Sequence, residues 1–161
     1  MKQITIDLRL KVQSIEIYED TEILGVFLGK ADAKVDLDLQ IVHNRPNLKS
    51  YTLFKAVLFD HSQLNFRGTL IINQGAKFTD TYLKASVLMM SPTAVAKAIP
   101  ALEIMEDEVK GGHGATISKI DPEELFYLQS RGLNKQESET IIVDAFLAEV
   151  TNRLNTNNDG R

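Results

Sequence analysis

The stretch VDLDLQIVHNRPNLKSYTLFKAVLFDHSQLNFRGTLII, residues 35–72, carries the pattern that decides the fold. Apolar and polar residues alternate over residues 35–41, and runs rich in β-branched and aromatic residues follow at 51–59 and 64–72. A period of two places successive side chains on opposite faces of a strand. The segments between the runs have the composition of turns, and Pro46 lies in the first of them. The stretch therefore predicts three short strands joined by turns.

The same texture extends in both directions, over residues 2–116. Apolar residues alternate from Ile4 to Val12, and another strand-like run covers residues 82–90. Many short strands at even spacing predict a sandwich, a barrel or a β-solenoid. Asn-Gly and Asp-Gly turns are nearly absent from this region, which weighs against a series of hairpins. Small residues in or beside the strands suit the tight interior of a coiled sheet and favour the solenoid; they are Ala56, Gly68, Ala76, Ala85 and Ala94.

The pattern changes to helical after residue 120. Asp121 is a good N-cap, Pro122 suits the first helical position, and Glu124 at N3 completes a capping box. Arg131 and Gly132 then end this first helix, with the arginine expected to satisfy its last carbonyls.

A second helix follows, with Asn134 as its N-cap and Glu137 at N3. Its apolar residues recur at helical spacing, and we expect one apolar stripe made of Ile141, Ile142, Ala145, Phe146, Val150 and Leu154. The chain therefore divides into a β-helix over residues 1–118, a helical segment over 119–154 and a disordered tail over 155–161.

Composition narrows the class of protein. The 161 residues include 43% hydrophobic and 25% charged residues, a globular balance for about one domain. The net charge of −4, without a basic run, argues against nucleic-acid binding. The chain has no cysteine, which removes disulfides and thiolate ligands to a metal or cluster. The sequence contains neither a signal peptide nor a membrane-spanning run, so we expect a cytoplasmic protein without membrane contact.

Two consecutive segments resemble a known family. VKGGHGAT at residues 109–116, followed by IDPEELFYLQSRGL at 120–133, is similar to the signature of the SufB/SufD family of iron–sulfur cluster assembly proteins. That family carries an HGAT or HEAT element, an acidic helix start and then FYLRSRG. Other elements agree in order and approximate spacing, so that the resemblance covers about residues 40–150; they lie at residues 66–68, 76–80, 88–91 and 100–104.

The resemblance implies a mainly β fold, a right-handed parallel β-helix followed by a short C-terminal pair of helices. It implies a scaffold or accessory subunit of a cluster assembly complex, with no catalysis of its own. The expected partners are a SufC-type ATPase of the ABC class, docked through the C-terminal helices, and a SufB-like subunit or a second copy. The chain itself has no Walker motif. The residues expected to dock the ATPase are Phe126, Tyr127, Arg131 and Gly132.

The resemblance also implies a cluster or iron site at a subunit interface, to which His113 would contribute. SufD-type sequences usually have Lys-Cys-Ser-His where this chain has Lys110 to His113 without cysteine, so a partner would have to supply the thiolates. The chain is also far shorter than full family members. We expect no cofactor of its own beyond such shared iron or cluster. The alternative role for His113 is to close the last coil by hydrogen bonding.

The remaining polar candidates have simpler interpretations. His43 precedes a turn and is predicted to stabilise it, and His61 is predicted to be a loop residue. The three histidines show no metal-binding spacing. An acidic group is predicted to form a solvated face; its members are Glu103, Glu106, Asp107 and Glu108.

Besides the working assembly subunit, two other functions stay open from the sequence. The first is a degenerate, stand-alone dimeric β-helix protein that has lost cluster chemistry. An enzyme on a β-helix, with His113 as its base, has less support, because the hexapeptide repeat of acyltransferases and the secretion signal of a lyase are both missing. In either leading case we expect dimerisation by strand pairing at the edge near residues 4–12.

Overall fold

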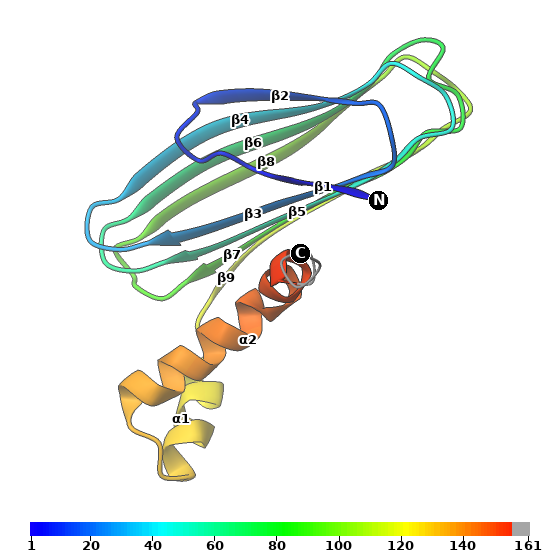
Figure 1. Ribbon diagram of the computed structural model, residues 1–161. Helices are drawn as coiled ribbons and strands as arrows, with labels where there is room; N and C mark the ends of the chain where they lie inside the picture. Colours follow the sequence, from blue (N-terminus) through cyan, green and yellow to red (C-terminus); the bar gives the residue numbers. More distant parts are fainter. Residues whose placement is uncertain (156–161) are drawn as a thin grey trace.

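The computed structural model describes residues 1–155, which form two parallel sheets followed by two helices (Figure 1). The strands are β1 (Lys2–Thr5), β2 (Val12–Ile17), β3 (Thr21–Gly29), β4 (Lys34–His43), β5 (Lys49–Leu58), β6 (Gln63–Ile72), β7 (Asp80–Met89), β8 (Val95–Ile104) and β9 (Lys110–Lys119). The helices are α1 (Pro122–Ser130) and α2 (Lys135–Asn155).

The chain winds as a β-solenoid of about 4 turns. Successive strands alternate between the sheets, which have the orders β1-β3-β5-β7-β9 and β2-β4-β6-β8. All pairings are parallel, so each residue lies beside its counterpart one coil further along; Ser50 pairs with Thr81, and Thr81 with Gly111. The predicted parallel β-helix with two C-terminal helices is confirmed.

The core lies between the two sheets and is filled by the inward face of every coil. Phe54 of β5 and Phe66 of β6 stack across it, with ring centroids 4.5 Å apart. Gly68 leaves room for this packing, because a Cβ atom added there would lie 3.0 Å from Cε1 and Cζ of the Phe66 ring and 2.6 Å from Cδ1 of Leu83. The small residues expected inside the coil are buried as predicted; Ala56, Ala76, Ala85 and Ala94 are all 5% exposed or less.

Helix α2 covers the outer face of the odd-numbered sheet (Figure 1). Its Val150 packs on Leu24 and Leu53, and its Val143 packs near Val57 and Leu88. These two contacts explain why four outward positions of β3, β5 and β7 are apolar although they lie outside the solenoid core; they are Leu24, Leu53, Val57 and Leu88.

A buried lysine adds a polar attachment between α2 and the sheet. Nζ of Lys55 donates a hydrogen bond to the Phe146 carbonyl at 2.7 Å and lies 3.0 Å from Glu149. The same ammonium lies over the Phe146 ring, 4.7 Å from its centroid. Glu149 also contacts Lys84 at 3.2 Å. The hydrogen bond from Lys55 is the main reason that the pKa of the Glu149 carboxyl is lowered.

The helix caps follow the sequence prediction in most details. The Asp121 carboxylate accepts the Glu123 amide at 2.8 Å. Asn134 and Glu137 exchange side-chain-to-backbone hydrogen bonds of 2.8 and 3.0 Å, a complete capping box. The apolar stripe of α2 is shifted from the predicted one, because Val143 is buried whereas Ile141 is 43% exposed. Contact with the sheet decides which face of α2 is buried, and the spacing of apolar residues within the helix carries no information about that contact.

The N-terminal alternation does not form one strand. β1 ends at Thr5 and β2 begins at Val12, with a turn between them. Ile6 is buried, but Leu10 and Val12 are 46% and 63% exposed, so the apolar face expected for this run is wrong. The reason is that the solenoid bends here from one sheet to the other, which ends the two-residue period.

Within residues 1–155, neither helix is long and apolar enough to cross a membrane. The solenoid ends with β9 at Lys119 and the helical segment begins with Pro122. Of the tail expected over residues 155–161, Asn155 closes α2, and the remaining residues lie outside the described part of the chain.

Candidate functional site

The solenoid is open at its last coil. After β9 the chain leaves for α1 instead of adding another strand, so β8 and β9 are the outer strands of the two sheets (Figure 1). Most of β9 is exposed, and no residue of β8 is fully buried. Ile104 and Ile117 are 43% and 46% exposed, although their counterparts one coil earlier, Ile72 and Val87, are completely buried. An uncovered edge of this kind offers free backbone groups to another chain.

His113 lies on the inward side of this open end. It pairs with Leu83, whose side chain points into the core, and neighbouring residues of parallel strands point to the same face. The imidazole is nevertheless exposed, because no further coil covers it. Nearby positions of β8 are apolar and partly buried, and they include Ala98 and Leu102. A histidine is therefore presented within an apolar end surface.

The glycines beside His113 make room for a tyrosine on the opposite face of β9. A Cβ atom added at Gly112 would lie 2.9 Å from Cδ2 of Tyr82, and one at Gly114 would lie 3.1 Å from the Tyr82 hydroxyl oxygen. Neither glycine has a positive φ, so the backbone does not require them. Sequence reasoning missed Tyr82, since its packing depends on the pairing of β7 with β9.

Helix α1 and the turn that follows it hold the residues expected to dock a partner, and none of the residues of α1 is buried. Phe126 and Tyr127 are 72% and 58% exposed. The Arg131 guanidinium does not satisfy the helix carbonyls as expected. It lies over the Tyr127 ring, 5.5 Å from its centroid, and donates weakly to the Tyr127 hydroxyl at 3.3 Å. Gly132 has φ +98°, the left-handed conformation that ends a helix, as predicted.

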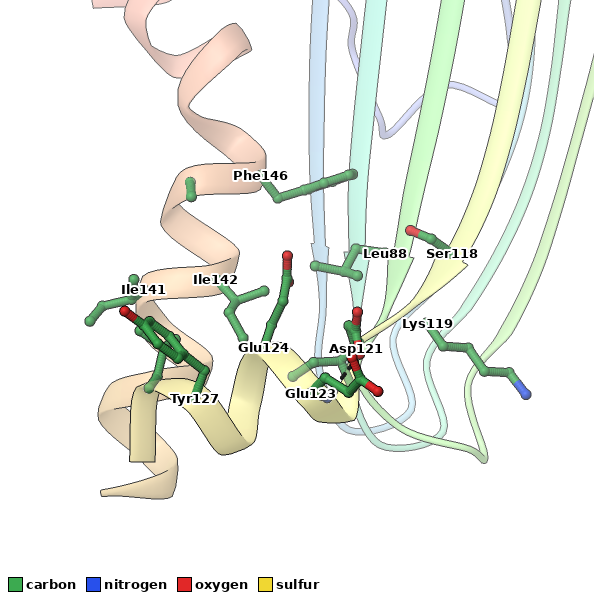
Figure 2. Close-up of a pocket in the computed structure, with 13 residues that line it drawn as sticks. Leu88, Ser118, Lys119, Asp121, Glu123, Glu124, Tyr127, Ile141, Ile142 and Phe146 are labelled. Atoms are coloured by element: carbon green, nitrogen blue, oxygen red, sulfur yellow. Dashed lines mark hydrogen bonds between the residues drawn. The ribbon is translucent and has the colours of Figure 1, made fainter. Parts of the chain in front are cut away.

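A groove of about 710 Å³ runs between α1, α2 and the ends of β7 and β9 (Figure 2). Its apolar lining includes Leu88, Ile142 and Phe146, and acidic side chains from the start of α1 border it, among them Glu123 and Glu124. The groove thus lies between α1 on one side and α2 and the sheet on the other.

His43 directly precedes the turn between β4 and β5, as the sequence suggested, and its ring reaches across that turn to Ser50 from within the core. It is completely buried, with Nδ1 3.4 Å from the Ile71 carbonyl oxygen and Nε2 3.0 Å from Oγ of Ser50. Ser50 in turn bonds to Thr81 at 2.6 Å. Burial lowers the pKa of the imidazole, so the neutral form is favoured. His61 lies exposed at a corner of the solenoid, as expected for a loop residue.

The acidic group is dispersed over a corner of the solenoid. Glu108 pairs with Lys77 at 2.9 Å, and Glu106 accepts the Gly75 amide at 2.9 Å. That backbone hydrogen bond is the main cause of the lowered pKa of Glu106. Glu103 and Asp107 are exposed. Among residues 1–155 no group of three or more His, Cys, Asp or Glu side chains is arranged to hold a metal ion.

Comparison with known proteins agrees with this architecture. Residues 6–146 match the family model described as "SUF system FeS cluster assembly, SufBD core domain". The chain is 36% identical over 137 residues to the iron–sulfur cluster assembly protein SufD of Bacillus subtilis, covering 85% of this chain and 31% of that protein. It is 39% identical over 112 residues to SufD of Escherichia coli, covering 70% of this chain and 26% of that protein.

A SufBD family protein of Synechocystis is 32% identical over 134 residues, with 83% of this chain and 30% of that protein covered. The chain thus spans about a third or less of the length of these relatives. The matched region contains the whole solenoid from Ile6, the open end with His113, and most of the helical segment. This chain belongs to the SufBD family of the iron–sulfur cluster assembly system.

Proposed function

We propose that this chain is a scaffold subunit of a SUF-type assembly complex, with no catalytic activity of its own. The observation that carries the proposal is the open end of the solenoid, where a family histidine, His113, is exposed within an unpaired, partly apolar surface. A single imidazole cannot hold a cluster, because clusters are usually held by several thiolates. The cluster is therefore cargo, assembled with ligands that a second subunit supplies.

The second subunit covers β8 and β9. These outer strands have ten residues each, against four and six in β1 and β2. The longer edge carries the exposed apolar residues Ile104 and Ile117. We therefore assign the subunit interface to this end and not to residues 4–12. The partner that supplies the ligands is a SufB-like chain that brings cysteines. A second copy of this chain could pair at the same edge, but it has no cysteine to contribute.

The C-terminal helices dock a SufC-type ATPase. Support comes from α1, which presents Phe126 and Tyr127 to solvent although each carries a large apolar ring. Tyrosine and arginine are common at the centres of protein interfaces, and Arg131 already lies against Tyr127. Gly132 sets the turn that holds α1 beside α2.

Light scattering on the chain alone, and mixed with the SufC-type ATPase of the same organism, tests the docking proposal. We expect a complex that is lost when Tyr127 and Arg131 are both replaced by alanine. Tyr18→Ala is the matched control, since Tyr18 is 56% exposed and also lies against an arginine, at the far end of the solenoid. A homodimer that ignores the ATPase would contradict the proposal and favour the stand-alone, degenerate alternative.

A further inference from the structure

Strand β9, which carries His113, makes few contacts that fix the position of this histidine. β9 is an outer strand with a single neighbour, β7, and His113 is surrounded by Gly111, Gly112 and Gly114. Glycine in a strand costs conformational entropy and contributes no side-chain packing. A precise position for the imidazole therefore needs a support outside the strand.

The Tyr82 ring is placed to provide that support. The ring contacts the space above Gly112 with Cδ2 and Cε2, at 2.9 and 3.0 Å from an added Cβ, and its hydroxyl reaches Gly114. It thus lies along the outer face of β9 on both sides of His113. The imidazole points to the inner face of the same strand. Tyr82 is 42% exposed, so its ring is held mainly by this contact and by its neighbours.

The neighbours of Tyr82 extend to α2. Tyr51, one coil earlier in the same outward row, stacks on Tyr82 with centroids 6.2 Å apart and planes 10° from parallel. The guanidinium of Arg153, in the last turn of α2, lies 5.0 Å from the centroid of the Tyr51 ring. Arg153 is itself paired with Glu22, the member of the same row one coil before Tyr51.

We propose that Tyr82 is a positioning residue for His113, that it acts through Gly112 and Gly114, and that Tyr51 and Arg153 tie it to α2. This proposal rests on the proposed role of His113 at the open end. It gives a physical reason for the glycines around the histidine, since a side chain at either position would displace the ring. It also connects the helix pair proposed to dock the ATPase with the strand that presents the histidine.

Nuclear magnetic resonance at one fixed pH tests the proposal on the free chain. The chain has three histidines, so the His113 ring signal is assigned with a His113→Gln variant. We expect Tyr82→Ala to shift the His113 signal and to speed amide exchange at residues 112–116 at least tenfold. Tyr82→Phe keeps the ring and should retain the native values. The His43 and His61 signals should not move in either variant, and Tyr18→Ala should leave His113 unchanged.

Two further variants keep the test decisive if Tyr82→Ala loses structure. Gly112→Ala should push the ring away and produce a similar change at His113, and adding Tyr82→Ala to it should produce little more, because the two changes remove the same contact. Arg153→Gln should give a smaller change of the same kind. A His113 signal and β9 exchange rates that stay native in Tyr82→Ala and Gly112→Ala would overturn the proposal. Cluster assembly in the complex that is unaffected by His113→Gln, with the expected NMR changes in Tyr82→Ala, would instead count against the proposed function and leave the positioning contact standing.

Discussion

The inner coils and the last coil of the solenoid use the same backbone geometry for different purposes. One row of paired inward positions runs through Ile23, Thr52, Leu83 and His113. The first three side chains are completely buried, whereas the histidine is exposed. In the inner coils each residue is covered by the next turn, so packing selects its identity. In the last coil no further turn among residues 1–155 covers the row, and His113 is left exposed to solvent.

The helices repeat this contrast on the outside of the protein. α2 buries Val143 and Val150 against the sheet, whereas α1 buries none of its residues and exposes Phe126. Both the open end and α1 present apolar groups that the chain itself does not cover. Stability and function are therefore separated along the molecule, with the surfaces proposed to bind partners lying at its C-terminal end.

The contrast between the inner coils and the last coil predicts different roles for two paired leucines. Leu70 and Leu102 are paired in β6 and β8, but Leu70 is fully buried and Leu102 only partly. We expect Leu70→Ala to lower the free energy of unfolding by about 2–5 kcal/mol. Leu102→Ala should cost clearly less in the isolated chain and should weaken subunit association. Denaturant titration of both variants measures the difference, and equal losses would contradict the contrast between coils.

A second test concerns the attachment of α2. Lys55→Met keeps the apolar stem but removes the hydrogen bond to the Phe146 carbonyl and the ion pair with Glu149. We expect a loss of about 1–3 kcal/mol in unfolding free energy, typical of a hydrogen bond from a charged group. Lys84→Met is the control, since Lys84 is 41% exposed and should contribute less than about 1 kcal/mol. If both variants unfold at the same denaturant concentration, burial of Lys55 does not matter.

A third test uses the buried histidine of the inner coils. The pKa of His43 lies below its ordinary value of 6.5 because the ring is buried. As the pH falls below 6.5, the unfolded chain therefore takes up a proton before the folded chain does, and stability must decrease. The denaturant concentration at the unfolding midpoint of the native protein should decrease as the pH is lowered from 7.5 to 5. That part of the decrease should vanish in His43→Leu and persist in His61→Gln; its survival in His43→Leu would rule out this origin.

The smallest expected effect is at a solenoid corner. Asn47 and Phe78 make the same turn one coil apart, with φ of 61° and 59°. Their amides donate to Lys77 and Glu108 carbonyls in the same way. Asparagine tolerates this left-handed conformation better than phenylalanine, and Phe78 is 59% exposed, so Phe78→Asn should raise stability by about 1 kcal/mol. The reverse change, Asn47→Phe, should lower it; calorimetry showing the opposite signs would refute the argument.

The sequence predicted what depends on local periods. Alternation located the strands around residues 35–41 and 64–72, and cap residues located both helices. Paired strands of neighbouring coils join residues that are 19 to 32 positions apart, so the local two-residue period carries no information about these contacts. For this reason the burial of His43 and the contact of Tyr82 with β9 were missed, and the alternation over residues 4–12 was wrongly predicted to form one strand. The family motif, and not periodicity, pointed to His113.

We propose that the open end formed by β8 and β9 is the surface on which a second SufBD-type subunit docks. Hydrogen–deuterium exchange, with and without the SufB-like chain of the same organism, tests it most directly. We expect slower exchange at residues 95–104 and 110–119, and unchanged exchange at residues 2–5 and 12–17. A stable complex in which exchange slows at β1 and β2 and is unchanged at β8 and β9 would contradict this placement of the subunit interface.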